Sequence, residues 1–391
     1  MFSPYPEDKL VAQICIVAAR RTPQGRLGGA LARLSATELA VAAGRAALEN
    51  IGPEHIDRVI VGNVLGAGLG MNVARQIGLR LAIPLDRPAM TVNMMCASGM
   101  QAVILAVQSI LAGESRAVLC GGAESMSGAP YLLDRARGGY RLGDGALIDG
   151  LLRDGLVDPT TGQHMGLSAE RLAERYTIDQ AAQDAFAVRS QARTAAAYAE
   201  GHYRAELVPL AELAEDEHPR PNTTIEQLAS LRPAFKPDGT VTAGNASGIN
   251  DGAAMLVVCD GETAKERGWQ RLATLGPFAT AGCEPELMGL GPVHATRRLC
   301  RQNRINLDAF DMIEINEAFA SQTLACMKEL ALGNDRVNVD GGAIALGHPI
   351  GASGARLAVH LAHAIFQGRS TRALATLCVG GGMGAAMVLE R

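Results

Sequence analysis

Two stretches far apart in this chain repeat the same spacing of apolar residues and glycines. In each stretch, an Ala-Ser-Gly triplet opens a long apolar segment with the pattern of a buried helix, and an apolar strand ending in glycine follows. Spacing that agrees over about seventy residues indicates a duplicated α/β unit. The matching positions are segments 51–61 and 305–315, the triplets 97–99 and 352–354, and the helix-ending Gly113 and Gly368.

The length of 391 residues agrees with two packed units, because a single hydrophobic core stops growing below this size. Each half follows the order helix, strand, helix, strand, and its strands are continuous apolar runs, as in a sheet covered on both faces. Helical crossovers favour parallel pairing. Ser35 and Glu38 predict a capping box for a helix through Leu48, and Ser98 and Ser353 are predicted N-caps.

A segment of different composition, from about residue 127 to 245, separates the two halves. It contains charged helices, predicted over 168–176 and 180–201, and loops rich in glycine and aspartate such as 137–145. An insertion of this length is usually functional, so we expect it to cover a ligand. Its basic residues would suit a polyanionic ligand, although each one alone is equally a solvated surface charge: Arg135, Arg137, Arg141, Arg220, Arg232 and Lys236.

Composition excludes several classes of function. The formal net charge of -4 and the aromatic content of 4% argue against nucleic acid as the main partner. The eight cysteines form no C-x-x-C pair, and several lie in apolar runs, so neither a metal site nor a disulfide framework is expected. The N-terminus has no export signal pattern, and no run of eighteen apolar residues occurs. We therefore expect a protein of the reducing cytoplasm that does not associate with membranes.

Three reactive side chains stand in glycine-rich surroundings: Cys96, His348 and Cys378. Two thiols and an imidazole suit chemistry that needs a nucleophile, a base and an acid near neutral pH. Cys96 follows a predicted strand and precedes a predicted helix, where backbone N–H groups favour a thiolate and supply an oxyanion hole. Because the repeat makes Cys96 equivalent to Gly351, the two helix starts could face one another across a shared site. The pattern points to acyl transfer through a cysteine.

Each reactive residue also has a purely structural interpretation. Cys96 and Cys378 could be buried small apolar side chains, and His348 a hydrogen-bonded structural histidine. The glycines of 380–384 expose N–H donors suited to an oxyanion, but no Lys-Ser/Thr follows them to make a phosphate loop. Asn316, at the carboxyl end of a predicted strand, could hold a water or a carbonyl oxygen, or it could cap a helix.

With these residues identified, the chain resembles the thiolase family over nearly its whole length. The resemblance rests on seven strings that occur in the family's order. They are AARRTPQG at 18–25, NMMCASG at 93–99, GGAESM at 121–126, AGNASGINDGA at 243–253, NEAFA at 316–320, GGAIALGHPIGASG at 341–354 and CVGGGMG at 378–384.

This resemblance implies a five-layered αβαβα thiolase fold built from two duplicated halves plus an inserted loop domain, assembled as a homodimer or homotetramer. Residues 1–127 together with 246–275 would form the N-terminal half. Residues 128–245 would form the loop domain that covers coenzyme A, and 276–391 the C-terminal half.

The resemblance also assigns the catalytic residues. Cys96 would be the nucleophile that accepts the acyl group, His348 the base that takes its proton, and Cys378 the acid/base that handles the α-proton of the second acyl-CoA. One oxyanion hole would use His348 with a water held by Asn316. The other would use the backbone N–H groups of Cys96 and Gly380. Splitting the reaction through an acyl-enzyme predicts ping-pong kinetics.

Contacts to the acyl-CoA follow from the same resemblance. The implied residues are Ser247, Ala243 and Gly244 at the pantetheine, His164, Met165 and Phe235 along the channel, Met288 at the acyl group and Arg220 at the nucleotide end. The chain departs from its short-chain relatives at the nucleotide end. Gln227 stands where a serine often meets the adenine, and Pro219 and Pro221 flank Arg220.

The implied activity is the reversible Claisen condensation of two acetyl-CoA to acetoacetyl-CoA and CoA, with no cofactor beyond these thioester substrates. The strings at 164–166 and 288–292 favour short acyl chains, while Asn-Met-Met before Cys96 leaves a broader 3-ketoacyl-CoA thiolase of fatty acid degradation open. A decarboxylating ketoacyl synthase would lack the second thiol. A non-catalytic acyl-CoA carrier would not need the three reactive residues.

Overall fold

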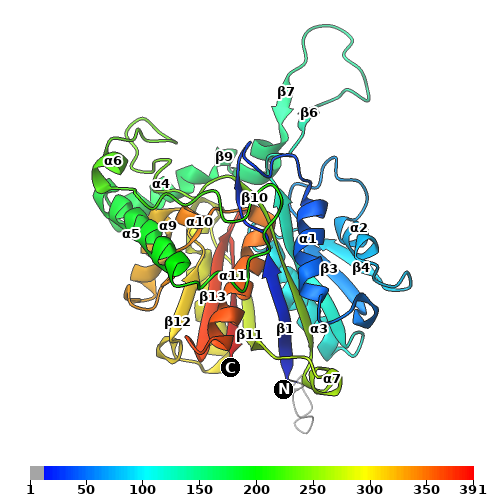
Figure 1. Ribbon diagram of the computed structural model, residues 1–391. Coiled ribbons are helices and arrows are strands. Elements are labelled where there is room, and N and C mark those ends of the chain that lie inside the picture. The colour runs from blue at the N-terminus through cyan, green and yellow to red at the C-terminus, as the bar shows by residue number, and fades with distance from the viewer. Residues whose placement is uncertain (1–12) are drawn as a thin grey trace, which may run out of the picture.

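A single large sheet runs through the molecule and organises both halves (Figure 1). The computed structural model describes residues 13–391, and over these residues ten strands form this sheet. Residues 1–12, where no export signal is expected, lie outside the described part. In spatial order the strands are β12 (Met312–Ile315), β13 (Arg372–Val379), β14 (Met383–Glu390), β11 (Ala273–Gly282), β1 (Ile14–Arg21), β10 (Asn250–Asp260), β5 (Ala117–Ser125), β3 (Arg58–Gly62) and β4 (Ala89–Val92), with β2 (Gly25–Arg26) paired to β10.

Strand pairing is mixed, so the expectation of parallel pairing holds for only part of the sheet. β3 pairs in parallel with β4 and β5, and β12 pairs in parallel with β13. The remaining pairs are antiparallel. β13 and β14 form a hairpin through Gly380, Gly381 and Gly382, a connection too short for a parallel crossover. Gly381 and Gly382 adopt positive φ angles of 84° and 81° in this turn.

The predicted duplication is present in the structure. Asp57 Oδ2 accepts hydrogen bonds from the N–H groups of Arg116 and Ala117, just before and at the start of β5. Asp311, its counterpart in the repeat, accepts them from Thr371 and Arg372 before and at the start of β13. Equivalent carboxylates therefore bind the start of equivalent strands in the two halves. The two helix-ending glycines, Gly113 and Gly368, also share left-handed φ angles of 77° and 76°.

Strands of both halves enclose a central helical layer, and alternation along the strands directs the other side chains to the outer helices. In β10, Leu256 and Val258 pack into the core around α3 (Ser98–Leu111) and α11 (Ile350–Phe366). Their neighbours Met255 and Val257 point to the opposite face, which is covered by other helices. The outer helices are α1 (Ala36–Leu48) and α2 (Val73–Arg80) on the first half, and α8 (Gly291–Asn303) and α9 (Ala320–Glu329) on the second.

The helix starts agree only partly with prediction. The Ser35 capping box is present at α1, which ends at Leu48 as expected. Ser98 and Ser353 are not N-caps, since Ala97 and Pro349 occupy those positions. Both serines lie inside the first turns, and their hydroxyls bond to the loops that precede the helices.

The segment between the halves carries both helices predicted for it, as α4 (Met165–Tyr176) and α5 (Gln180–Ala199), followed by α6 (Ile225–Ala229). Its first part is a two-stranded arm of β6 (Tyr131–Leu133) and β7 (Leu147–Asp149) that projects from the body in Figure 1. A second short hairpin, β8 (Val157–Asp158) with β9 (Gln163–His164), leads into α4. No helix within residues 13–391 has the length and apolar character needed to cross a membrane.

A buried ionic network fastens the end of this segment to the body. Glu206 bonds to Arg21 at the end of β1 at 2.6 Å and to His360 of α11 at 2.9 Å. The other ring nitrogen of His360 lies 2.9 Å from Asp340. Burial lowers the pKa of His360, but the two carboxylates outweigh this effect and raise it to about 9. The imidazole is therefore charged at neutral pH and completes the ion pairs.

Helices α3 and α11 touch through their backbones near their N-terminal ends. A Cβ atom on Gly99 would lie 2.8 Å from the nitrogen of Ala355, and one on Gly354 would lie 2.7 Å from the nitrogen of Met100. Real Cβ atoms do not approach backbone this closely, so the crossing requires glycine on both helices. The loops that end in Cys96 and His348 precede these turns, and the crossing brings those loops to the same end of the helix pair.

Substitution of Gly99 by alanine should therefore separate the two helices. We expect Gly99→Ala to lower the free energy of unfolding by about 1–3 kcal/mol, as overpacking does elsewhere, and to reduce activity. Gly44→Ala in α1 is the matched control, because the one close contact of its Cβ would be the flexible end of Leu81 rather than backbone. Urea unfolding of both variants measures the difference. Equal stability of Gly99→Ala and the unmodified protein would contradict the proposed close crossing.

Candidate active site

The loop before α3 holds Cys96 in a tight, internally bonded turn. Met95 adopts a left-handed φ of 47°, which is costly for a residue with a side chain. Its N–H donates to Asn93 Oδ1 at 3.0 Å, and its carbonyl accepts from Ser98 Oγ at 2.7 Å. Ser98 Oγ also accepts from the N–H of Met94 at 2.8 Å. These hydrogen bonds fix the loop that carries Cys96. Cys96 itself is buried, with 4% of its surface exposed.

Two backbone N–H groups act on the buried sulfur of Cys96. Burial raises the pKa of the thiol to about 11, and hydrogen bonds from the N–H groups of Gly380 and of Cys96 itself oppose the rise. The two N–H groups come from different halves of the fold. N–H groups beside a nucleophilic sulfur are suited to stabilise the negative charge that a thioester oxygen develops during attack.

His348 is held in one tautomer. Ser353 Oγ contacts the carbonyl of Pro349 at 2.9 Å and His348 Nδ1 at 2.5 Å. A carbonyl can only accept, so the single hydroxyl proton goes to Pro349 and Nδ1–H must donate to Ser353. Nε2 is therefore unprotonated and available as a base. The backbone N–H of His348 donates to Asn250 Oδ1 at 2.9 Å, which fixes the loop.

Burial keeps the imidazole of His348 neutral. It lowers the pKa to about 4, and the positive charge of Arg356 adds to the effect. Since the pKa of Cys96 is about 11, proton transfer from thiol to imidazole is unfavourable in the free protein. The proton moves only when attack on a substrate makes the sulfur more acidic, so the arrangement suits general-base catalysis rather than a permanent ion pair.

Asn316 lies beside the free nitrogen of His348. Its Nδ2 is 3.5 Å from Nε2, and its buried Oδ1 has no hydrogen-bond partner among the described residues. The alternative that Asn316 caps a helix is wrong, because α9 starts at Ala320 with Phe319 in the N-cap position. A buried amide oxygen without a partner next to a base suits a bound water or ligand group.

Cys378 is the second-last residue of β13 and lies in a small apolar cluster with Met165, Met288 and Phe319. Burial raises the pKa of this thiol well above its ordinary value, and the nearby Cys96 adds to the rise. Gly380, two residues further on, approaches Met165 so closely that a Cβ would lie 3.0 Å from its sulfur. The structure therefore brings Cys96, Cys378 and the Gly380 N–H to one place.

The predicted channel residues gather around the same cluster. The rings of His164 and Phe235 are stacked with centroids 4.8 Å apart, and Phe319 meets Phe235 edge-on at 5.9 Å. Met288 belongs to this apolar cluster. The backbone N–H of Ser247 donates a hydrogen bond at 3.0 Å to the carbonyl of Ala318, another member of the cluster.

Other predicted binding residues lie further out. Gly244 packs against Leu228 of α6, and Ala243 precedes it on the same turn. Arg220 is exposed, and its backbone N–H donates to Gln191 Oε1 at 2.7 Å.

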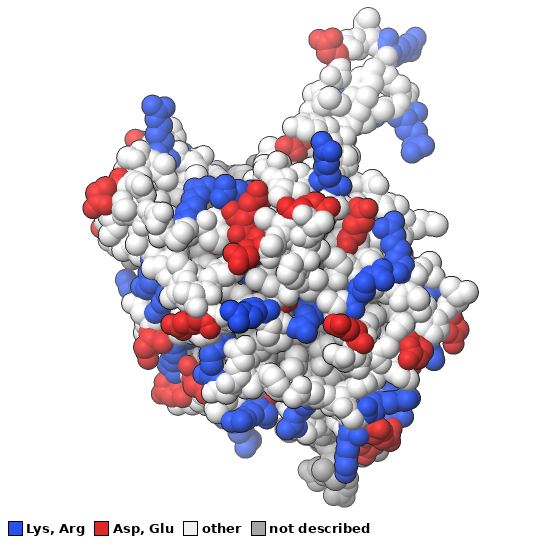
Figure 2. Space-filling model, in the orientation of Figure 1, with Lys and Arg blue, Asp and Glu red and all other residues white. Residues whose placement is uncertain are grey.

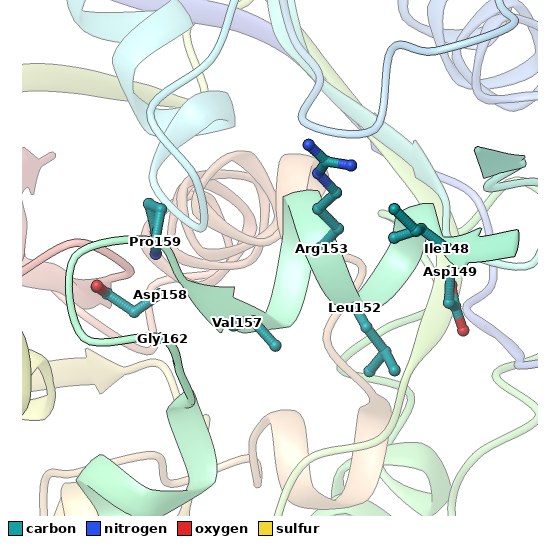
Figure 3. A pocket seen from close by; sticks show the side chains of 8 residues that line it. All are labelled: Ile148, Asp149, Leu152, Arg153, Val157, Asp158, Pro159 and Gly162. Carbon is teal, nitrogen blue, oxygen red and sulfur yellow. The ribbon is translucent and has the colours of Figure 1, made fainter. Parts of the chain in front are cut away.

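An open cavity of about 390 Å³ lies at the base of the arm. Figure 3 shows Leu152 and Val157 pointing into the same space, with Arg153 directed to the other side. Asp158 lines this cavity and also a small one of about 10 Å³ that is bordered by His164, Met165 and Met288. An opening to solvent therefore lies beside the predicted channel.

Three residues that support the site could not be assigned that role from the sequence. Asn250 and Ser353 hold His348, and Glu124 bonds to the loop after β3 and to the first turn of α11. Only its position in the sequence could have drawn attention to Glu124, because it is an acidic residue at the end of an otherwise apolar strand. Its partners are distant in the sequence and could not be identified.

The sequence matches the thiolase N-terminal domain over residues 14–262 and the thiolase C-terminal domain over residues 269–391. The chain belongs to the thiolase family. It is 50% identical to an acetyl-CoA acetyltransferase of Escherichia coli (strain K12), with 96% of this chain and 98% of the relative covered. It is 47% identical to an acetyl-CoA acetyltransferase of Chromobacterium violaceum, covering 97% of this chain and all of the relative.

Solved structures give the same family for this thiolase. The crystal structure of human mitochondrial 3-ketoacyl-CoA thiolase in complex with CoA superposes with a TM-score of 0.95 at 41% identity, covering 97% of this chain and 98% of that one. The acetyl-CoA acetyltransferase of Bacillus anthracis gives a TM-score of 0.94 at 40% identity, covering 97% and 99%. These similarities confirm the predicted thiolase fold.

Removal of the Ser353 hydroxyl should remove the hydrogen bond that fixes the tautomer of His348. We expect Ser353→Ala to lower kcat by about ten- to a hundred-fold, less than the loss of a general base, because Nδ1–H loses its acceptor. Ser109→Ala, which removes a buried hydroxyl from the equivalent helix α3, should leave kcat unchanged. Steady-state kinetics with thermal unfolding as a check separates catalysis from stability. Unchanged kcat in Ser353→Ala would mean that the tautomer does not depend on this contact.

Proposed function

We propose that this thiolase carries out the reversible Claisen condensation of two acetyl-CoA to acetoacetyl-CoA and CoA, through an acyl group carried on Cys96. One observation supports it most: the sulfur of Cys96 receives the N–H of Gly380 from the other half of the fold, with the second thiol, Cys378, close by. The relatives named acetyl-CoA acetyltransferase cover nearly the whole chain, which supports the same reaction here.

In the thiolysis direction, the thiol of Cys96 attacks the 3-keto carbon of the substrate and its proton passes to Nε2 of His348. The carbon–carbon bond breaks, and the enolate of acetyl-CoA takes a proton from Cys378. The thiol of CoA then returns a proton to Cys378 and attacks the acyl group. Cys96 leaves with the proton held by His348, so each group regains its starting state.

Two oxyanions form in this sequence, and the site offers donors for both. The N–H groups of Cys96 and Gly380 face the acyl oxygen on Cys96. The amide of Asn316, with an unsatisfied oxygen, would hold a water beside His348 for the thioester oxygen of the enolate. This chemistry needs only coenzyme A thioesters and no further cofactor.

The apolar surroundings of Cys378 favour short acyl chains. Met165, Met288 and Phe319 fill the space beside this thiol, and the small cavity next to Met165 and Met288 measures only about 10 Å³. A broader 3-ketoacyl-CoA range is the alternative, supported by the likeness to human mitochondrial 3-ketoacyl-CoA thiolase. The second thiol, Cys378, argues against a decarboxylating ketoacyl synthase.

The remaining contacts to CoA follow the family pattern. Ser247, Ala243 and Gly244 would meet the pantetheine, and Arg220 would meet the nucleotide end. Gln227 differs from the serine often found there, and its Oε1 accepts the N–H of Thr224 in the capping box of α6. All eight cysteines are free, which supports a reducing compartment such as the cytoplasm.

Exposed apolar side chains support a homodimer or homotetramer. The edge strand β4 carries the exposed Met90, and Leu85 before it is also exposed. On the arm, Leu142 is 97% exposed and Leu147 is 69% exposed, and Figure 2 shows that most of the arm's visible surface is uncharged. Apolar side chains on an edge strand and on a projecting arm suit contacts with further copies of the chain.

An acylation experiment distinguishes the roles of the two thiols, Cys96 and Cys378. We expect Cys96→Ala to abolish the acetyl-enzyme because the nucleophile is lost, while Cys378→Ala still becomes acetylated at Cys96 but loses at least about 10²-fold in condensation. Peptide mass spectrometry after mixing with acetyl-CoA checks both variants. Acetyl groups found on a residue other than Cys96 would contradict the assignment. Cys300→Ala, a half-exposed thiol in α8, serves as the control.

The molar mass in solution tests whether the arm joins copies of the chain. We expect the double substitution Leu142→Asp and Leu147→Asp to lower the molar mass in solution, because charges would enter an apolar contact. Leu27→Asp, at another exposed leucine, is the control and should leave the mass unchanged. Light scattering coupled to size-exclusion chromatography gives the mass. An unchanged mass in the arm variant would show that the arm does not join copies.

A further inference from the structure

The side chain of Glu124 has an unusually complete set of partners for a carboxylate with no exposure to solvent. Its Oε1 accepts from Asn63 Nδ2 at 2.8 Å and from the N–H of Leu65 at 3.1 Å. Its Oε2 accepts from the N–H groups of Val64 at 3.0 Å and Gly351 at 2.9 Å. Each oxygen thus receives two donors, which leaves no position for a proton without the loss of a bond.

These four donors come from both halves of the fold. Three follow β3 in the first half, and the fourth, Gly351, lies in the first turn of α11 in the second half, three residues after His348. A Cβ on Gly351 would lie 2.5 Å from Oε2, so the carboxylate lies directly against the helix N-terminus. The positive end of the helix dipole favours a negative charge at this position. Glu124 therefore joins the halves where the loop of His348 begins α11.

Val64 and Leu65, whose N–H groups bond to this carboxylate, pack in the same buried cluster as Cys96. Burial is the main cause of the raised pKa of Cys96, and the negative charge of Glu124 raises it further, because a second negative charge nearby is unfavourable. Burial raises the pKa of Glu124 itself to about 7, against the effect of its N–H donors, so the carboxyl is charged in alkaline solution. The other titratable groups near this pair are Asp251 of β10, which acts on Glu124, and Cys378 of β13, which interacts with Cys96.

We propose that Glu124 is a positioning residue of the acyl-transfer site, which joins the start of α11 to the first half and places one buried negative charge beside Cys96. This inference rests on the proposed function of Cys96 as the nucleophile. The charge adds to the effect of burial, which keeps Cys96 as a thiol in the free enzyme. The bond of Glu124 to the N–H of Gly351 holds the first turn of α11, which follows the loop of His348.

Two substitutions separate the charge from the position. Glu124→Gln removes the charge and places an amide NH₂ against two N–H donors, whereas Glu124→Asp keeps the charge but is too short to reach all four donors. Asp57→Asn is the matched control, since Asp57 accepts two N–H groups at the opposite end of β5, about 23 Å along the strand. The measurement is the rate of alkylation of Cys96 by iodoacetamide from pH 7.5 to 11.5, with the site of modification mapped by mass spectrometry.

In Glu124→Gln we expect the midpoint of the alkylation profile to fall by about one pH unit or more, and kcat to fall more than KM changes. In Glu124→Asp we expect the midpoint of the unmodified enzyme together with a kcat at least about ten-fold lower. Asp57→Asn should keep both values. An unchanged midpoint in folded Glu124→Gln, or full kcat in Glu124→Asp, would overturn the proposal.

Glu124→Asp retains its value as a test if Glu124→Gln does not fold. The result is also distinct from a failure of the proposed function. If acetyl-CoA labels a residue other than Cys96, the acyl-transfer assignment fails, while the alkylation midpoints still report whether Glu124 places its charge beside this thiol.

Discussion

The backbone contact between α3 and α11 is the constraint on which the rest of the site depends. Each helix presents a glycine to the other, so the two axes approach until Gly99 and Gly354 meet main-chain atoms. The duplicated halves place a reactive loop before each helix, one with Cys96 and one with His348. A side chain at either glycine would move these loops apart, and the Gly380 N–H would no longer reach the sulfur of Cys96.

Burial then determines the chemistry of the groups that the crossing brings together. It raises the pKa of Cys96 to about 11 and lowers that of His348 to about 4, so thiol and imidazole are both neutral before substrate arrives. A neutral pair avoids the cost of buried charges in the free protein. The N–H groups and the Ser353 hydroxyl are already in place, so attack on a thioester needs little rearrangement of the protein.

Much of this account follows from local sequence patterns. The repeated spacing predicted two like halves, the Ser35 capping box predicted the start of α1, and the glycine-framed Cys96, His348 and Cys378 predicted the reacting groups. These features depend on residues close together in the chain or on a repeat that is visible by inspection. The structure confirms the first two and brings the thiols together.

Other features could not be predicted because they depend on distant partners. Ser353 was expected to cap α11, but the helix starts at Ile350, which places the hydroxyl against His348 instead. The network of Arg21, Glu206 and His360 joins three regions that no local pattern connects. The antiparallel pairing of β14 depends on the tight glycine turn after β13, which composition alone does not distinguish from a loop.

The most direct test of the account is a crystal structure of Cys378→Ala after exposure to acetyl-CoA. We expect the acetyl group on the sulfur of Cys96, with its carbonyl oxygen within hydrogen-bond distance of the N–H groups of Cys96 and Gly380. An acetyl group on another residue, or a carbonyl oxygen turned away from these two N–H groups, would contradict the claim that the crossed helices assemble the acyl-transfer site.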